Sequence, residues 1–178
     1  GHRSLDIHWT QEMFDQGGVM REMVKWDYEL RNAKQVETIV DRAVTVAMTE
    51  PRGPVYLSLP REVLAEKPGD FTFQSPTRRQ PARPPTADAN AIDEAAEILA
   101  NAENPIIITA SMGQNRAAVP ALESLAERFA LPVISYRPRY VNISTDHPMH
   151  MGYEPGAYLP DADAILVLDC DVPWIPSL

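Results

Sequence analysis

Four short, almost wholly apolar runs constrain the fold of this chain most strongly. They are residues 55–59, 106–110, 133–136 and 164–169. A strand that is buried on both faces has this continuous apolar character, which is typical of a parallel sheet. Before and between them, three segments carry apolar residues at three- and four-residue spacing, which predicts helices at residues 33–50, 91–102 and 119–129. The alternation predicts an α/β fold with parallel, Rossmann-like (doubly wound) sheets.

Proline divides this pattern into two parts. The chain has 17 prolines in 178 residues, about twice the usual share of ~5%. They are dense in residues 66–87, where we expect an extended interdomain linker whose Phe71 and Phe73 lie against a surface. The predicted organisation is therefore a first region at residues 1–65, the linker, and a second region at residues 88–178 that opens with Asp88 as a helix N-cap.

The first region gives weaker signals. Residues 8–16 predict a short helical turn that Gly17-Gly18 ends, and residues 23–26 are either a short strand or an extended loop. Asn32 is the expected N-cap of the following helix.

This region therefore offers one clear strand, which cannot pair with itself or cover both of its faces. We expect both α/β units to be incomplete and to belong to a larger protein. The alternative is a complete small domain with an unusual amino-terminal extension.

Charge and cysteine content exclude several classes of protein. The 16 Lys and Arg against 25 Asp and Glu give a net charge of −9, which repels nucleic-acid phosphates. No apolar run is long enough for a membrane helix. The single cysteine, Cys170, excludes a disulfide framework and predicts a reducing, cytoplasmic location. Its acidic neighbours Asp169 and Asp171 should raise the thiol pKa, so we expect a packed, unreactive cysteine.

Several segments resemble the thiamine diphosphate-dependent enzymes, and the nearest branch is similar to acetolactate synthase. Residues 53–64 (GPVYLSLPREVL), after a helix that contains Arg42-Ala43, resemble the end of the family's pyrimidine-binding domain. Residues 9–12 (WTQE) with Lys25 resemble an earlier segment of that domain. Three further segments resemble the start of the family's central domain. They are residues 104–108, residues 131–133 and the His147-Pro148…Gly152 loop.

The resemblance implies a parent enzyme that uses thiamine diphosphate and Mg²⁺ on 2-keto acids and that forms dimers or tetramers. In the family a glutamate assists cofactor activation, and a Gly-Asp-Gly…Asn motif holds Mg²⁺ and the diphosphate. We expect neither in these residues, because the glutamate would fall upstream of Gly1 and Gly69-Asp70-Phe71 departs from the motif. We therefore expect no catalytic residue and no bound cofactor in this chain alone, and we expect the rest of its polypeptide to be a required partner.

Two sets of residues are candidates for binding. Gln11 and Lys25 match polar positions on the substrate side in the family, and the alternative is ordinary surface polarity. Ser111, Met112 and Gly113 follow a buried strand, where a nucleotide such as FAD or ADP binds in some relatives. Ser111 replaces the first glycine of the family's Gly-x-Gly, and the alternative is a structural turn.

Other polar groups favour structural roles. Asp146, His147 and His150 lie in a loop, where His-x-x-His spacing is weak evidence for a metal, so we predict no metal site. Trp174 either packs on the missing part or lines a pocket. Two functions of other classes stay open, a nucleotide-binding (FAD, ADP or CoA) module without catalysis and a non-catalytic interaction domain.

Overall fold

The structure, a computed structural model, describes residues 13–67, 69–70 and 80–176. The chain divides into two compact units, Gly1–Thr86 and Ala87–Leu178, and each is described by itself. Among the described residues no helix combines the length and the apolar character that crossing a bilayer requires. The predicted contacts of Phe71 and Phe73 lie outside the described residues.

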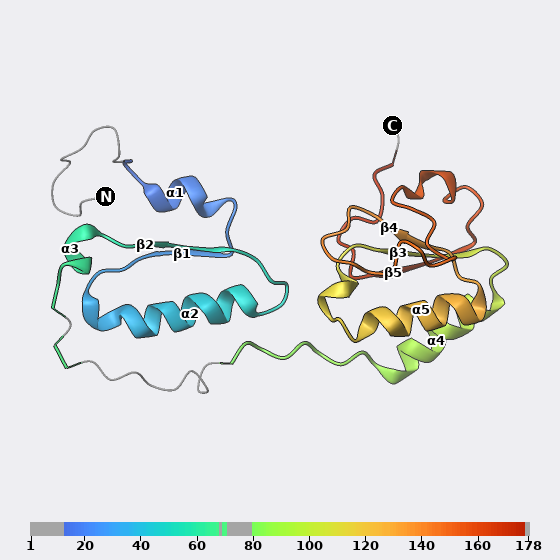
Figure 1. The fold of residues 1–178 in the computed structure, drawn as a ribbon, viewed down its shortest axis with the longest axis horizontal. Helices are drawn as coiled ribbons and strands as arrows, with labels where there is room; N and C mark the ends of the chain where they lie inside the picture. Colours follow the sequence, from blue (N-terminus) through green and yellow to red (C-terminus); the bar gives the residue numbers. More distant parts are fainter. Residues whose placement is uncertain (1–12, 68, 71–79, 177–178) are drawn as a thin grey trace. The chain divides into compact units, whose positions relative to one another are not determined.

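The first unit is a two-stranded parallel sheet between two helices (Figure 1). Strands β1 (Trp26–Glu29) and β2 (Val55–Ser58) pair from Trp26–Val55 to Glu29–Ser58. Helix α1 (Gln16–Arg21) covers one face and helix α2 (Val36–Met48) the other. A 3₁₀ turn, η1 (Ala33–Gln35), leads into α2, and the short helix α3 (Arg61–Leu64) follows β2.

Strand β1 corrects the expectation that β2 lacks a partner in this region. Trp26 and Tyr28 pack toward the core of Leu30, Ile39 and Val63, whereas the two acidic residues of β1 alternate with them. Because these acidic residues interrupt the apolar sequence, a search for continuous apolar runs does not find the strand. The sheet nevertheless stays open, because all four residues of β2 are only half-buried.

Gly17-Gly18 lies inside α1 and does not end a helix, which is a second correction. Asp15 caps α1 through a hydrogen bond from the Gly18 N–H to its Oδ1 (2.8 Å). A Cβ on Gly18 would lie 2.4 Å from Asp15 Oδ2, and one on Gly17 would lie 2.7 Å from Asp27 Oδ1. A side chain at either glycine would therefore require the neighbouring carboxylate to shift.

The second unit is a three-stranded parallel sheet with the order β4-β3-β5. Its strands are β3 (Pro105–Thr109), β4 (Val133–Ser135) and β5 (Ala164–Leu168). Its helices are α4 (Ala89–Asn101) and α5 (Ala118–Phe129), with 3₁₀ turns η3 (Met112–Gln114) and η4 (Pro155–Ala157). These elements confirm the parallel α/β fold class.

The two faces of this sheet are covered differently. Leu122 and Ala126 of α5 pack on Ile107 and Val133, and Figure 1 shows α4 and α5 on the same side. Ile106, Ile108 and Ile134 face the other side, where Met151, Tyr158, Leu159 and Trp174 cover them. Irregular chain thus takes the place that a helix has in a doubly wound sheet, and Trp174 packs on its own unit.

The helix ends test the predicted caps. Asp88 caps α4 as expected, because its Oδ1 accepts the N–H groups of Asn90 and Ala91. Asn32 makes no side-chain capping bond, and the Ala33 N–H is instead bound by Glu66 Oε2 at 2.9 Å. Helix α4 forms as predicted but buries none of its residues fully, and Ile92 of the predicted apolar stripe is 55% exposed.

Candidate functional site

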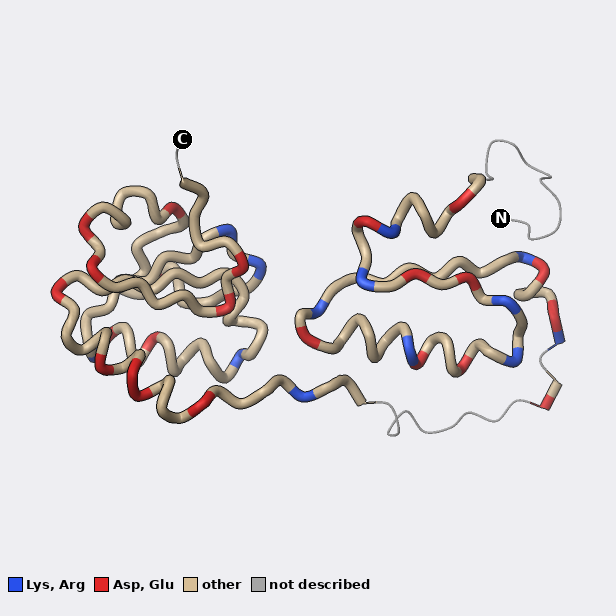
Figure 2. Tube along the Cα trace, turned by 180° about the vertical axis from the view of Figure 1, so that it is seen from behind, with Lys and Arg blue, Asp and Glu red and all other residues tan. Residues whose placement is uncertain are grey.

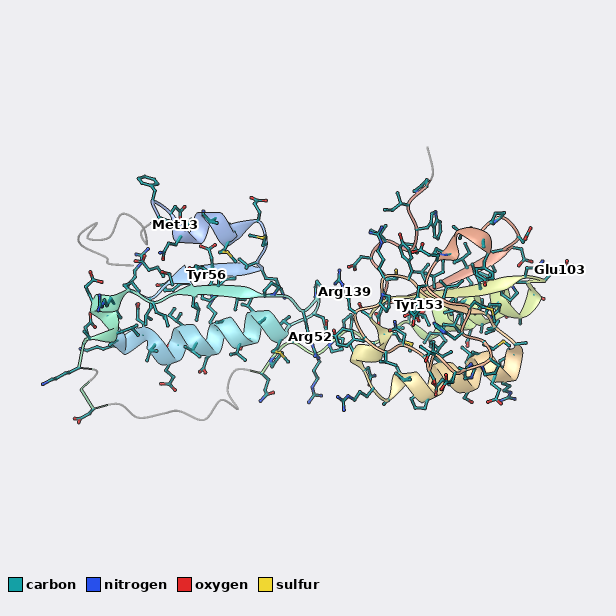
Figure 3. All side chains as sticks on the ribbon, turned by 45° about the horizontal axis from the view of Figure 1, so that its top comes forward. Met13, Arg52, Tyr56, Glu103, Arg139 and Tyr153 are labelled. Carbon is teal, nitrogen blue, oxygen red and sulfur yellow. The ribbon has the colours of Figure 1, made fainter. Side chains whose placement is uncertain are left out.

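The carboxyl edge of the second sheet is where an open α/β fold binds ligands. In Figure 3, Arg139 lies at this edge and Glu103 at the opposite, amino edge of the sheet. The chain leaves β4 through Arg137 (φ 46°) and β5 through Asp169 (φ 45°), both in the left-handed region. The Ser111 N–H donates to the Asp169 carbonyl at 2.9 Å, which ties the ends of β3 and β5 together.

The predicted nucleotide loop, Ser111–Gly113, is well ordered by its own bonds. Ser111 has φ −128°, which any residue adopts, so its backbone does not require a glycine there. The Gln114 and Asn115 N–H groups donate to the carbonyls of Ser111 and Met112. Met112 is buried in the core beside α5. These bonds are compatible with the alternative, a structural turn, and nucleotide binding by the loop stays a prediction.

Asn142 is the residue at this edge that sequence reasoning missed. Its side chain is buried, with 1% exposed. Its Oδ1 accepts the Gly113 N–H at 2.9 Å, and its Nδ2 donates to the Ala110 carbonyl at 3.1 Å. The signal for it in the sequence was slight, a lone asparagine between Val141 and Ile143 in a segment without regular periodicity.

Lys25, the predicted substrate-side cation, is engaged with helix α2. Its Nζ donates to the carbonyl of Val46 at 2.8 Å and to that of Thr49 at 2.6 Å. A cation at these carbonyls satisfies the carboxyl end of the helix and its dipole. The structure thus gives Lys25 a structural task, while its substrate contact stays a prediction. Gln11, the other predicted residue, lies outside the described residues.

Metal ligands such as Mg²⁺ requires are not gathered in one place among the described residues. No group of three or more His, Cys, Asp or Glu residues is placed to hold a metal in the part of the chain that is described. Gly69 and Asp70 are exposed, and His147 Nδ1 accepts the Met149 N–H at 3.2 Å. His150 stacks edge-on against Tyr153. These contacts support the structural reading of the loop that holds both histidines.

Cys170 is half-buried against the core of Ile106 and Ile108. Burial raises the pKa of its thiol, and the charge of Asp171 raises it further. The predicted direction of the pKa shift is correct, but desolvation is the larger cause and Asp171 the smaller one. A thiol that stays protonated is a poor nucleophile.

The comparisons with known proteins agree with this fold. Residues 92–175 match the family model described as thiamine pyrophosphate enzyme, central domain. Sulfoacetaldehyde acetyltransferase of Rhodobacter capsulatus is 28% identical, over 85% of this chain and 25% of its own length. Acetolactate synthase of Arthrospira platensis is 25% identical, over 76% of this chain and 24% of its own length.

A solved structure extends the similarity over both units. The thiamine diphosphate-dependent 4-hydroxybenzoylformate decarboxylase of Rhodococcus jostii RHA1 superposes with a TM-score of 0.66 and 26% identity. The superposition covers 86% of this chain and 30% of that one. The chain thus spans about a quarter of the length of the curated relatives that it matches. Together with the parallel α/β architecture, these similarities identify residues 92–175 as a central domain of the thiamine diphosphate-dependent enzyme family, and the rest of the chain is similar to the same enzymes.

Proposed function

We propose that this chain is part of a thiamine diphosphate- and Mg²⁺-dependent enzyme that acts on 2-keto acids by decarboxylation or carboligation. The family match over residues 92–175 carries the proposal. The named relatives, an acetolactate synthase, an acetyltransferase and a decarboxylase, support this range of reactions. In such enzymes the bound thiazolium ring serves as an electron sink.

The two units have different places in this proposal. The second unit contributes the central domain, and the first unit corresponds to the end of the pyrimidine-binding domain, as the resemblance of residues 53–64 implies. The rest of the polypeptide would supply the groups that hold the cofactor, and a dimer or tetramer would complete the site. Gln11 and Lys25 remain candidates for the substrate side of that site.

A nucleotide-binding module without catalysis is the second candidate, and the geometry does not favour it. The Ser111 and Gly113 amides of this loop, which would face a phosphate, already have acceptors within the chain. An FAD absorbance band in the purified protein would argue for this candidate.

Calorimetry tests whether cofactor binding requires the rest of the polypeptide. Titration of the 178-residue chain with thiamine diphosphate and Mg²⁺ should give no saturable heat, because its described residues offer no metal cluster. The same titration of the polypeptide that contains these residues in their natural context should show binding. That polypeptide should also release CO₂ from a 2-keto acid only when both cofactors are present. Micromolar binding to the short chain, or cofactor-independent CO₂ release, would contradict the proposal.

A further inference from the structure

The carboxyl edge of the second sheet is closed by the chain itself. Residues 137–144, here called the strap, leave β4 and cross the end of β3. The Arg139 N–H donates to the Ala110 carbonyl at 3.0 Å. At the far end of the strap, the Ser144 N–H donates to Glu123 Oε1 of α5 at 2.9 Å. The strap is therefore fastened to β3 at one end and to α5 at the other.

Gly113 shows how closely the strap lies on the loop after β3. A Cβ at this position would lie 1.9 Å from the Val141 carbonyl oxygen and 2.6 Å from its carbon. Real Cβ atoms do not approach backbone atoms this closely, so a side chain at residue 113 would lift the strap. Gly156 in the same unit has open space around its Cβ position and provides a matched comparison.

Asn142 makes the central contact between strap and loop. In open α/β sheets, backbone N–H groups of the loop after a strand commonly bind the phosphate of a ligand. Here the Gly113 N–H donates to Asn142 Oδ1 (2.9 Å), and the amide nitrogen of Asn142 donates to Ala110 O (3.1 Å). An uncharged carboxamide oxygen occupies the acceptor position that a phosphate oxygen would take.

We propose that Asn142 is a built-in substitute for an anionic ligand and keeps this edge of the sheet closed. The neighbouring amides fit this role, because those of Ser111, Gln114 and Asn115 also donate to acceptors within the unit. A phosphate-bearing ligand would have to break the Gly113–Asn142 bond and leave the buried carboxamide without its donor. The loop after β3 is thus a closed structural element, even though it lies where such folds bind nucleotides.

Amide hydrogen exchange of the full 178-residue chain, followed by NMR, tests the proposal. In Asn142→Ala the Gly113 amide should exchange about tenfold faster, the change that the net loss of one ordinary hydrogen bond gives. The Leu131 amide, which donates to Ala126 O at 3.0 Å, should keep its protection and report that the unit is folded. Asn115→Ala is the matched control, because Asn115 Oδ1 also accepts a backbone N–H (Ala117) but is exposed.

A second variant and a titration keep the test decisive if Asn142→Ala does not fold. Gly113→Ala should expose the Ala110–Asn115 amides to exchange, whereas Gly156→Ala should not. ADP and inorganic phosphate, added separately to the unaltered chain at millimolar concentration, should not shift the Gly113 amide resonance. Saturable shifts of that resonance with either probe would overturn the proposal, and so would unchanged Gly113 protection in a folded Asn142→Ala variant.

Discussion

The two units differ in how far each encloses its own sheet. In the second unit, Ile107, Ile108, Val133 and Ile134 have no exposed surface. In the first unit no residue of β1 or β2 is fully buried. The third strand of the second unit explains the difference, because a two-stranded sheet is marginal by itself. We therefore expect the first unit to unfold at lower denaturant concentration than the second.

Charge separates the units as well. The second unit holds 13 of the 25 acidic residues but only 4 of the 16 basic ones, so it carries the whole net charge of −9. Figure 2 marks these acidic residues at many places along the Cα trace of this unit. The first unit is neutral, with 12 residues of each sign. The better-enclosed core thus tolerates the greater self-repulsion, which added salt should relieve.

The largest expected effect comes from truncating the enclosed sheet. Ile108→Ala should lower the free energy of unfolding of the second unit by about 2–5 kcal/mol, since a fully buried side chain leaves a cavity. Leu57→Ala in half-buried β2 should lower that of the first unit by less than half as much. Urea unfolding followed by hydrogen-exchange mass spectrometry reports on each unit separately. Equal losses would remove the distinction between the two sheets.

The carboxyl ends of α2 and α5 give the next contrast. Helix α5 ends at Ala130 in the left-handed conformation (φ 51°, ψ 42°), which glycine adopts without strain. Ala130→Gly should therefore stabilise the second unit by about 0.5–1 kcal/mol. Thermal unfolding would detect this as a higher melting temperature. Ala100→Gly, inside α4, is the control and should destabilise, so a fall in both variants would refute the argument.

At the carboxyl end of α2, the side chain of Lys25 satisfies the backbone instead, because its Nζ donates to the carbonyls of Val46 and Thr49. Lys25→Met should lower the stability of the first unit by roughly 0.5–1 kcal/mol, the usual contribution of a cation at a helix carboxyl end. Lys34→Met, near the amino end of α2, should not lower it, because the helix dipole disfavours a cation there. Chemical denaturation of both variants measures the two changes in the free energy of unfolding. If the two lysines behave alike, Lys25 does not cap the helix.

The smallest effect concerns one carboxylate in each unit. The hydrogen bond from Arg21 holds the pKa of Asp27 below its usual value. The backbone N–H groups of Glu103 and Asn104 do the same for Asp163. Because the folded pKa is lowered, each contribution to stability is present above about pH 4, the unfolded value. It is lost as the pH falls through the folded pKa.

Melting curves between pH 7 and pH 3 should therefore show acid destabilisation that Asp27→Asn and Asp163→Asn each reduce. Added salt should weaken the contribution of Asp27, whose partner is an exposed guanidinium. It should leave that of Asp163, whose donors are neutral amides, largely unchanged. Equal salt sensitivity of the two carboxylates would contradict this assignment.

Continuous apolar runs predicted the strands of the second unit within one residue at each end, and a three- to four-residue period predicted α2, α4 and α5. These patterns suffice because burial on both faces, or on one helix face, leaves a direct mark on composition. Strand β1 escaped the same search, because Asp27 and Glu29 alternate with Trp26 and Tyr28. The resemblance of residues 53–64 and of the His147-Pro148 loop pointed to the family whose central domain residues 92–175 match.

The site depended on tertiary structure. The sequence singled out Lys25 and the Ser111–Gly113 loop as polar or turn-forming, but the bonds they make are with Val46, Thr49 and Asn142. Those partners lie 21, 24 and 29 residues away along the chain. Local pattern therefore determined the elements and the fold class of this protein. Only the folded chain decided which hydrogen-bonding groups are already satisfied, because that depends on contacts between segments that no periodicity connects.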